Sequence, residues 1–195
     1  MDFRPYDDRA LELSRQIVDQ VTEQQLGLGT PCPPWTVREL LSHMVAQHLR
    51  FAAVARGEDP ERACPLDKAE LGDDPATTYR EAARALAEAF AAGREETVVL
   101  LPEIGRPVPL GALVSFHFFD FVVHGWDLAV SIGARYAPAA ELSALAAEVG
   151  QVIPDSSRVP GGSFAPRIEV GSDADELATL LGLAGRDPAW QRPAG

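Results

Sequence analysis

Lysine is almost absent from the chain: Lys68 is its only lysine, and the other basic residues are arginines. The 17 basic side chains stand against 29 acidic ones, which leaves a formal net charge of −12. A surface for nucleic acid or for an anionic membrane needs a basic patch, and no cluster of lysine or arginine occurs in the sequence. We therefore expect neither nucleic acid nor a membrane among its partners.

Cysteine is scarce as well, with only Cys32 and Cys64 in 195 residues. Two cysteines form no disulfide framework, so we expect free, chemically inert thiols in a reducing compartment. The acidic first residues predict no signal peptide, and no apolar run is long enough to cross a bilayer. A cytoplasmic location is the expectation. There is also no CxxC pair, glycine-rich phosphate loop or GxSxG motif.

Helical periodicity dominates what is present. Apolar residues recur at three- and four-residue steps in long segments, the mark of amphipathic helices. Thr36 and Glu39 form a capping-box pattern, and Asp74-Pro75 has the order typical of a helix start. The predicted helices span about 7–26, 36–56, 75–92 and 110–132, with a shorter one at 138–149.

The remaining segments carry weaker signals. Residues 97–101 and 106–109 are predicted short strands, and 57–73 a surface connection. After a turn-rich linker at 154–166, a strand is predicted at 167–170 and a last helix ending near Leu181. The prediction is a mainly α protein: a four-helix bundle over residues 1–153, with a small α/β segment over 154–195 packed on it.

The most apolar long segment, residues 115–130, nonetheless carries His117, Asp120, His124 and Asp127. At about 100° per residue these four lie within an arc of roughly 80° on a helix. The other faces are aromatic or aliphatic, which is typical of a buried helix. Buried imidazoles and carboxylates must be paired or must hold something. Our hypothesis is that they hold a metal ion.

Asp120 and His124 are spaced i, i+4 and so point to one spot, where they suit a single divalent ion. Zinc is the metal we expect, because it takes imidazole and carboxylate ligands and its catalytic sites keep one position open. Nickel, iron and manganese accept the same ligands. Periodicity leaves the third ligand open between His43, His48 and His117.

Each of these residues also has a plainer interpretation. A histidine on a buried helix, such as His48 or His117, is commonly a satisfied core residue. An Asp–His pair at i, i+4 is commonly a local hydrogen bond that fixes the imidazole tautomer. For Asp127, near the helix end, the plainer interpretation is an ion pair with an arginine or a hydrogen bond to a loop.

Two stretches resemble the mycothiol-dependent maleylpyruvate isomerase-like branch of the DinB superfamily. They are TPCPPWTVRELLSH at 30–43 and DFVVHGWDLA at 120–129. The end of the chain, 164–188, is similar to the C-terminal signature of an uncharacterised subgroup, so the resemblance covers nearly the whole chain. It implies a DinB-like bundle of four helices in an up-down-down-up arrangement, with one divalent metal near one end.

The resemblance also implies the ligand set. The family's metal ligands are a histidine eight residues after the tryptophan, then an acidic residue and a histidine at i, i+4. These positions correspond to His43, Asp120 and His124. The corresponding pattern that the resemblance implies for the isomerase itself is Glu-xxx-His. The aspartate at position 120 of this chain departs from that pattern.

The activity that the resemblance implies is a thiol-dependent transferase or isomerase acting on a small electrophile, with mycothiol as co-substrate. From their helical positions, His48 and His117 are catalytic pocket candidates, and Gln47 and Arg50 are cofactor-binding candidates. One rival hypothesis is another metal-dependent enzyme of specialised metabolism, such as a hydrolase, lyase or cyclase. A second is a non-catalytic small-molecule-binding module. We expect a small-molecule partner and a monomer or homodimer.

Overall fold

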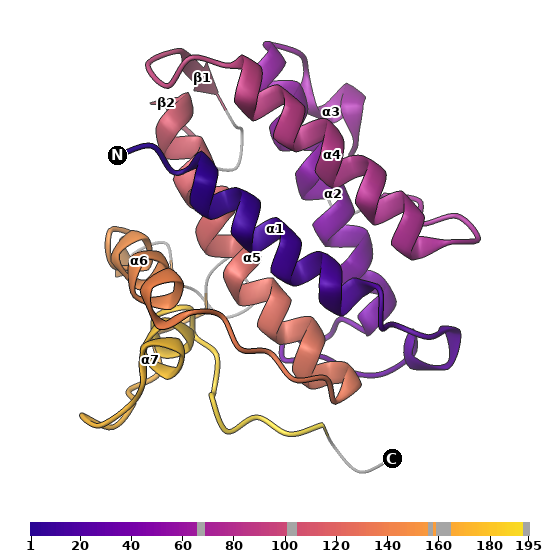
Figure 1. The fold of residues 1–195 in the computed structure, drawn as a ribbon, viewed down its shortest axis with the longest axis vertical. Coiled ribbons are helices and arrows are strands. Elements are labelled where there is room, and N and C mark those ends of the chain that lie inside the picture. The colour runs from indigo at the N-terminus through magenta and orange to yellow at the C-terminus, as the bar shows by residue number, and fades with distance from the viewer. Residues whose placement is uncertain (66–68, 101–104, 156–157, 159–164, 193–195) are drawn as a thin grey trace.

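The structure, a computed structural model, describes residues 1–65, 69–100, 105–155, 158 and 165–192. Its core is a bundle of four long helices in which α1 lies along α5 and α2 lies along α4 (Figure 1). The mainly helical fold predicted from the sequence is confirmed. The bundle helices are α1 (Arg4–Val18), α2 (Val37–Arg56), α4 (Pro75–Ala92) and α5 (Leu110–Ile132).

Side-chain contacts set the direction of the helices. Asp7 near the start of α1 meets His117 of α5, and Gln25 beyond the end of α1 reaches the last residue of α5, Ile132, so these two helices are parallel. Along α2 the order is reversed, because His43 meets His124 whereas the later His48 meets His117. Helix α2 is therefore antiparallel to α5.

Helix α4 completes the topology. Asp19, just after α1, pairs with Arg80 near the start of α4 at 2.6 Å. At the other end, Arg4 and Asp8 near the start of α1 line the same surface hollow as Glu88 near the end of α4. Helices α1 and α4 are thus antiparallel, which makes the order up-down-down-up as expected. The two parallel central helices require the long connection 57–74, in which the structure adds the single turn α3 (Pro60–Ala63).

Helix α1 ends eight residues earlier than predicted, at Val18. Gln25 Oε1 accepts hydrogen bonds from the backbone N–H of Thr22 at 2.9 Å and from its hydroxyl at 3.1 Å. This local capping box starts a separate 3-10 turn, η1 (Glu23–Gln25). No glycine or proline marks the break in the sequence, so periodicity alone extended the helix through it.

The predicted hairpin is present: β1 (Val98–Leu100) pairs antiparallel with β2 (Pro107–Pro109), with Val99 opposite Val108. Its predicted turn lies largely outside the described residues, as does most of the predicted linker 154–166. The strand predicted at 167–170 is wrong. That segment is bonded instead to the end of a helix, with the Ile168 N–H donating to the Gly182 carbonyl at 2.9 Å.

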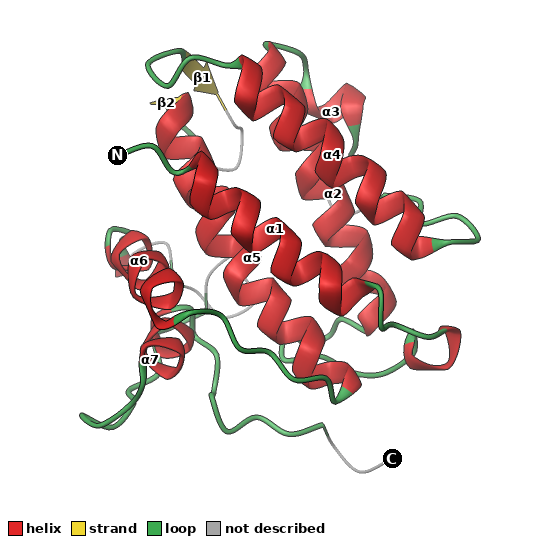
Figure 2. Cartoon of the chain, viewed as in Figure 1, coloured by secondary structure: helices red, strands yellow, loops and turns green. Residues whose placement is uncertain are grey.

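Two shorter helices, α6 (Ala140–Gln151) and α7 (Glu176–Leu183), lie side by side at one edge of the bundle (Figure 2). Helix α6 also packs on α5, where a Cβ at Gly150 would come within 2.7 Å of the Phe119 ring. The C-terminal region is therefore joined to the bundle through α6. The division into two units near residue 153 stays a prediction.

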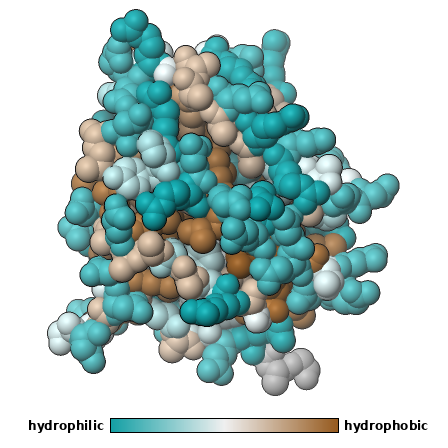
Figure 3. Space-filling model, in the orientation of Figure 1, coloured by the Kyte–Doolittle hydropathy of each residue, from teal (hydrophilic) through white to brown (hydrophobic). Residues whose placement is uncertain are grey.

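Helix α5 is the core of the molecule. By length and composition it could span a membrane, so the expectation that no apolar run is long enough was too strict. Yet 78% of its most apolar stretch is buried inside the protein. The face seen in Figure 3 is largely hydrophilic, with apolar atoms visible mainly between the outer side chains. The apolar surface of α5 is thus used in packing the bundle.

Gly125 lies in the middle of α5 because Tyr136 packs across it. The Tyr136 hydroxyl donates to the Val122 carbonyl at 2.9 Å, and a Cβ at position 125 would come within 2.8 Å of that hydroxyl. The loop after α5 is in this way fixed against the turn that carries His124.

We expect Gly125→Ala to destabilise the protein by about 1–3 kcal/mol through this overlap, although alanine is the better helix former. Gly111→Ala is the matched control on the same helix, because its Cβ would meet Glu95 only at an ordinary 3.6 Å. That control should be neutral or stabilising by up to about 1 kcal/mol. Urea unfolding of both variants measures the difference, and equal stabilities would contradict the packing argument.

Candidate metal centre

Three predicted ligands converge between α2 and α5. His43, Asp120 and His124 each offer a donor atom, and these atoms lie within 4.8 Å of one another. His124 Nε2 is 3.5 Å from an Asp120 oxygen, and the rings of His43 and His124 meet edge to face at 5.2 Å between centroids. Nitrogen and oxygen ligands of one tetrahedral zinc ion are ~3.3 Å apart, so small side-chain adjustments would close the set. The donors present fit a divalent cation.

The start of α2 places His43. Glu39 accepts the Thr36 backbone N–H at 2.7 Å while the Thr36 hydroxyl caps the Glu39 N–H, which is the capping box predicted from the sequence. Trp35, just before the cap, packs on the His43 ring with 4.6 Å between centroids. Thr30 holds this loop closed by donating twice to the Trp35 carbonyl. The imidazole is therefore supported on the loop side.

The ligands differ in exposure. The His124 side chain is 5% exposed, whereas that of Asp120 is 31% exposed and His43 is half-buried. The centre consequently has a closed inner side at His124 and an outer side open to solvent. A small molecule can reach a cation held there.

Asp127 fixes the other face of the His124 ring. Its Oδ2 is 3.0 Å from His124 Nδ1, which donates, so Nε2 is the nitrogen that faces Asp120. A ligating histidine commonly has such a carboxylate behind it. Burial would lower the pKa of His124, but the carboxylates of Asp120 and Asp127 outweigh it and raise the pKa to about 10. The two carboxylates thus favour the protonated ring, and a cation at Nε2 would compete with a proton for that nitrogen.

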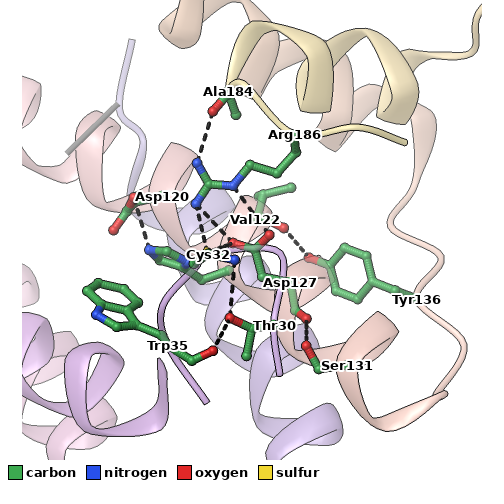
Figure 4. Close-up of polar contacts among 11 residues, drawn as sticks. Thr30, Cys32, Trp35, Asp120, Val122, Asp127, Ser131, Tyr136, Ala184 and Arg186 are labelled. Carbon is green, nitrogen blue, oxygen red and sulfur yellow. Dashed lines mark hydrogen bonds and ion pairs between the residues drawn. The ribbon is translucent and has the colours of Figure 1, made fainter. Parts of the chain in front are cut away.

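Asp127 is itself fully buried and has two further side-chain partners, both from outside its own helix (Figure 4). Arg186, from the segment after α7, donates to both carboxylate oxygens at 3.1 and 3.3 Å, and the Cys32 thiol donates at 3.1 Å. Burial would raise the pKa of Asp127, but Arg186 and then His124 hold it well below its ordinary value. Burial and the neighbouring Asp127 raise the pKa of the Cys32 thiol.

Sequence reasoning missed most of this second cluster. The ion pair to an arginine was one interpretation of Asp127, but nothing local pointed to Arg186, which lies 59 residues further along the chain. Cys32 was expected to have no chemical part, whereas it lies against the ligand His124 and its partner Asp127. Cys64 is buried, and both cysteines are free thiols, as predicted.

The structure places the pocket candidates His48 and His117 in the core, where both are fully buried. His48 Nδ1 is 3.2 Å from His117 Nε2, and His117 Nδ1 is 2.6 Å from a buried Asp7 oxygen. Both rings stack on Phe121. These residues form a second polar chain, separate from the three ligands, and its Asp7 end was not foreseen. A catalytic part for the two histidines stays a prediction.

The two cofactor-binding candidates, Arg50 and Gln47, differ in burial. Arg50 is 1% exposed and donates to the Cys64 carbonyl at 2.8 Å, besides pairing with Glu61 at 2.7 Å. Its charge thus fastens the α3 region to α2. Gln47 is half-buried, one helical turn after His43. Binding of a cofactor by either residue stays a prediction, and position favours Gln47.

Comparison with known proteins decides the family. The family model described as "Mycothiol maleylpyruvate isomerase N-terminal domain" matches residues 8–129, well over half of the chain. The chain belongs to this family. The matched range contains the three predicted ligands together with Cys32 and Asp127, but it ends before Arg186. The isomerase-family domain thus includes the whole candidate centre, and the guanidinium beside it comes from outside the domain.

The chain is also similar to curated proteins and to solved structures. Two uncharacterized proteins of Mycobacterium tuberculosis, from strains CDC 1551 and H37Rv, are each 29% identical over 179 residues, covering 89% of this chain and 93% of theirs. Among solved structures, the mycothiol-dependent maleylpyruvate isomerase and a histidine-to-alanine mutant of it share the fold, with a TM-score of 0.61 at 14% identity. That match covers 75% of this chain and 65% of the isomerase chain, so this chain spans less than two thirds of the isomerase.

The buried histidine chain generates a prediction for acid stability. Burial and the adjacent His117 hold the pKa of His48 well below 6.5. Below pH 6.5 the unfolded chain therefore binds a proton that the folded protein does not, so stability falls as the pH falls. From pH 8 to pH 5 this group should cost about 2 kcal/mol of unfolding free energy, a cost that His48→Leu should remove.

Urea unfolding at a series of pH values measures that slope. Tyr79→Phe is the matched control, because Tyr79 packs edge-on against His48 but burial raises its pKa above the ordinary 10.0. Its loss of the Ser14 hydrogen bond should lower stability equally at every pH. An unchanged acid slope in His48→Leu would show that His48 is protonated in the folded state.

Proposed function

We propose that the protein binds one divalent cation through His43, Asp120 and His124 and catalyses a thiol-dependent transfer or isomerisation on a small electrophile. The observation that carries this proposal is the convergence of the three donors from two helices, with donor atoms within 4.8 Å of one another and the outer side open. Zinc suits this nitrogen and oxygen set, and nickel, iron or manganese would accept it.

Some residues around the proposed cation would bind it, and others would orient those that bind. His124 and Asp120 would hold it from one helix, and His43 would hold it from across the bundle. Trp35 restricts the His43 ring, and Asp127 fixes the His124 tautomer, so the donors are oriented before the cation arrives. When bound, the cation would lower the pKa of a thiol or polarise a substrate carbonyl.

Mycothiol is the thiol we propose, because the family and the solved structures that match this fold are named for mycothiol-dependent isomerisation. Its sulfur would add to an activated alkene or to another electrophilic carbon of the substrate. The partly exposed side at Asp120 is where both molecules would enter. A small electrophile matches an open centre of this kind better than a polymer, which would need an extended binding surface.

The purified protein should contain about one equivalent of divalent metal by elemental analysis. Asp120→Ala combined with His124→Ala should lower metal affinity more than ~100-fold, since loss of an outer partner alone costs about 10–100-fold. Asp120→Glu should retain the metal, because the longer carboxylate reaches the same place.

Glu141→Ala is the control, since it removes an exposed carboxylate on α6 whose ion pair is a loose 3.9 Å. It should leave the metal content at the wild-type value. Protein purified without chelator that contains no metal, and takes up neither zinc nor nickel, would refute the metal centre.

Thiol dependence is tested with mycothiol and a panel of small electrophiles, followed by mass spectrometry. We expect adducts or isomers that require both thiol and metal, so that chelator or omission of thiol removes them. Asp120→Ala/His124→Ala protein should reduce turnover to the uncatalysed rate. Metal-loaded wild-type protein without any thiol-dependent turnover would favour another metal-dependent reaction or a binding module.

A further inference from the structure

We infer that the Arg186 guanidinium acts as a built-in cation, occupying a second donor set that could otherwise bind metal and so directing the metal to the Nε2 face of His124. Arg186 would then be a positioning residue. The inference rests on the proposed metal centre for its meaning, but its test is read from a variant of Arg186 and not from wild-type activity.

The second donor set shares one residue with the first. Cys32, His124 and Asp127 also offer donor atoms that lie within 4.8 Å of one another. His124 points Nε2 at Asp120 and Nδ1 at Asp127, so the two donor sets use different nitrogens of one ring. One set is composed of nitrogen and oxygen donors, whereas the other includes a sulfur, which is a strong ligand for zinc and its neighbours.

A positive charge already lies against the sulfur set. Arg186 Nη2 is 3.1 Å from Asp127 Oδ2 and 3.2 Å from Cys32 Sγ, and Nε is 3.3 Å from the other Asp127 oxygen. A guanidinium keeps its proton at any ordinary pH, and these contacts use its forked donors in the way a carboxylate prefers. A divalent ion on the same donors would meet this fixed charge at close range.

The guanidinium is held in place by the fold. Its third nitrogen, Nη1, donates to the Ala184 carbonyl at 2.9 Å, and the Arg186 backbone N–H donates to the Leu181 carbonyl at 2.8 Å. Further along, Arg192 ties the same segment to the Ser131 carbonyl of α5 at 2.9 Å. The side chain is 13% exposed, so the segment delivers it into a nearly closed position.

In a thiol-dependent site this arrangement would prevent Cys32 from competing with the co-substrate for the cation. A cation bound by the thiolate of Cys32 would already hold a sulfur ligand from the protein, in competition with the sulfur of a co-substrate. The Cys32 sulfur is already engaged, because its thiol donates to Asp127 and it accepts from Arg186, and the metal then meets only nitrogen and oxygen donors of the chain. The coordination position for sulfur remains available to the small molecule.

Cobalt(II) titration of metal-stripped protein tests the inference, because a thiolate ligand produces a sulfur-to-cobalt charge-transfer band that nitrogen and oxygen ligands do not. Wild-type protein should lack the band. Arg186→Ala and Arg186→Met should show it, with one proton of the Cys32 thiol released to the buffer per cobalt bound. The band should disappear when Cys32→Ser is added to either variant.

Two controls match the change. Arg186→Lys keeps the charge and should show no band, and Arg192→Ala loosens the same segment without touching the donors and should also show none. Arg186→Met retains the side-chain bulk in case Arg186→Ala fails to fold, which circular dichroism reports. Cobalt should also raise the melting temperature of the Arg186→Met variant unless Cys32 is replaced.

The absence of a sulfur band in both folded Arg186 variants, or its survival after Cys32→Ser, overturns the inference. A band that also appears in Arg192→Ala would do the same, because the charge of Arg186 would not be its cause. Failure of wild-type protein to bind cobalt is a separate result that refutes the proposed function. A sulfur band in the Arg186 variants would then show that Arg186 blocks the sulfur set, but not that it directs a metal to Nε2.

Discussion

The buried carboxylate of Asp127 joins three segments that are far apart in the sequence. It accepts hydrogen bonds from Cys32 in the loop before α2, from His124 on its own helix and from Arg186 beyond α7. Breaking a buried pair by removing one partner typically costs about 3–5 kcal/mol, because a charge is left uncompensated. The loop, the core helix and the C-terminal segment are therefore coupled, and the proposed ligand His124 lies at their meeting point.

Helix α5 combines two tasks that usually lie on different elements. Its aromatic and aliphatic side chains fill the core, while its polar stripe divides into two layers. The layer at His124 opens toward solvent through Asp120, and the layer at His117 is closed within the bundle. Since His117 and His124 sit on one continuous helix, the packing that fixes the inner layer also fixes the position of the outer one.

Local signals in the sequence were sufficient to predict several helix boundaries and the pairing of Asp120 with His124. The capping box at Thr36, the stop at Gly133 and the i, i+4 spacing of Asp120 and His124 are each carried by neighbouring residues, and each is present in the structure. Periodicity left three histidines as candidates for the third ligand. Family resemblance selected His43, which is the one the structure brings to the pair.

The predictions that were wrong or incomplete concern features that depend on contacts between residues far apart in the sequence. The segment 167–170 has strand-forming residues, but among the described residues it pairs with no strand and bonds to the end of α7 instead. Asp7 and Arg186 are charged residues that the sequence places at opposite ends of the chain. Only the fold shows that Asp7 is buried against His117 and that the largely covered Arg186 lies against Asp127. Burial of a charge is a tertiary property, so no local pattern announces it.

The two prolines of β2 have a consequence for self-association. The Leu110 N–H donates to the Thr97 carbonyl, so in an antiparallel ladder the amide of Val108 also faces β1. The outward amide positions then belong to Pro107 and Pro109, which have no N–H to donate. No further strand can therefore form a complete ladder along the outer edge of β2, and this edge of the hairpin is a poor template for edge-to-edge aggregation.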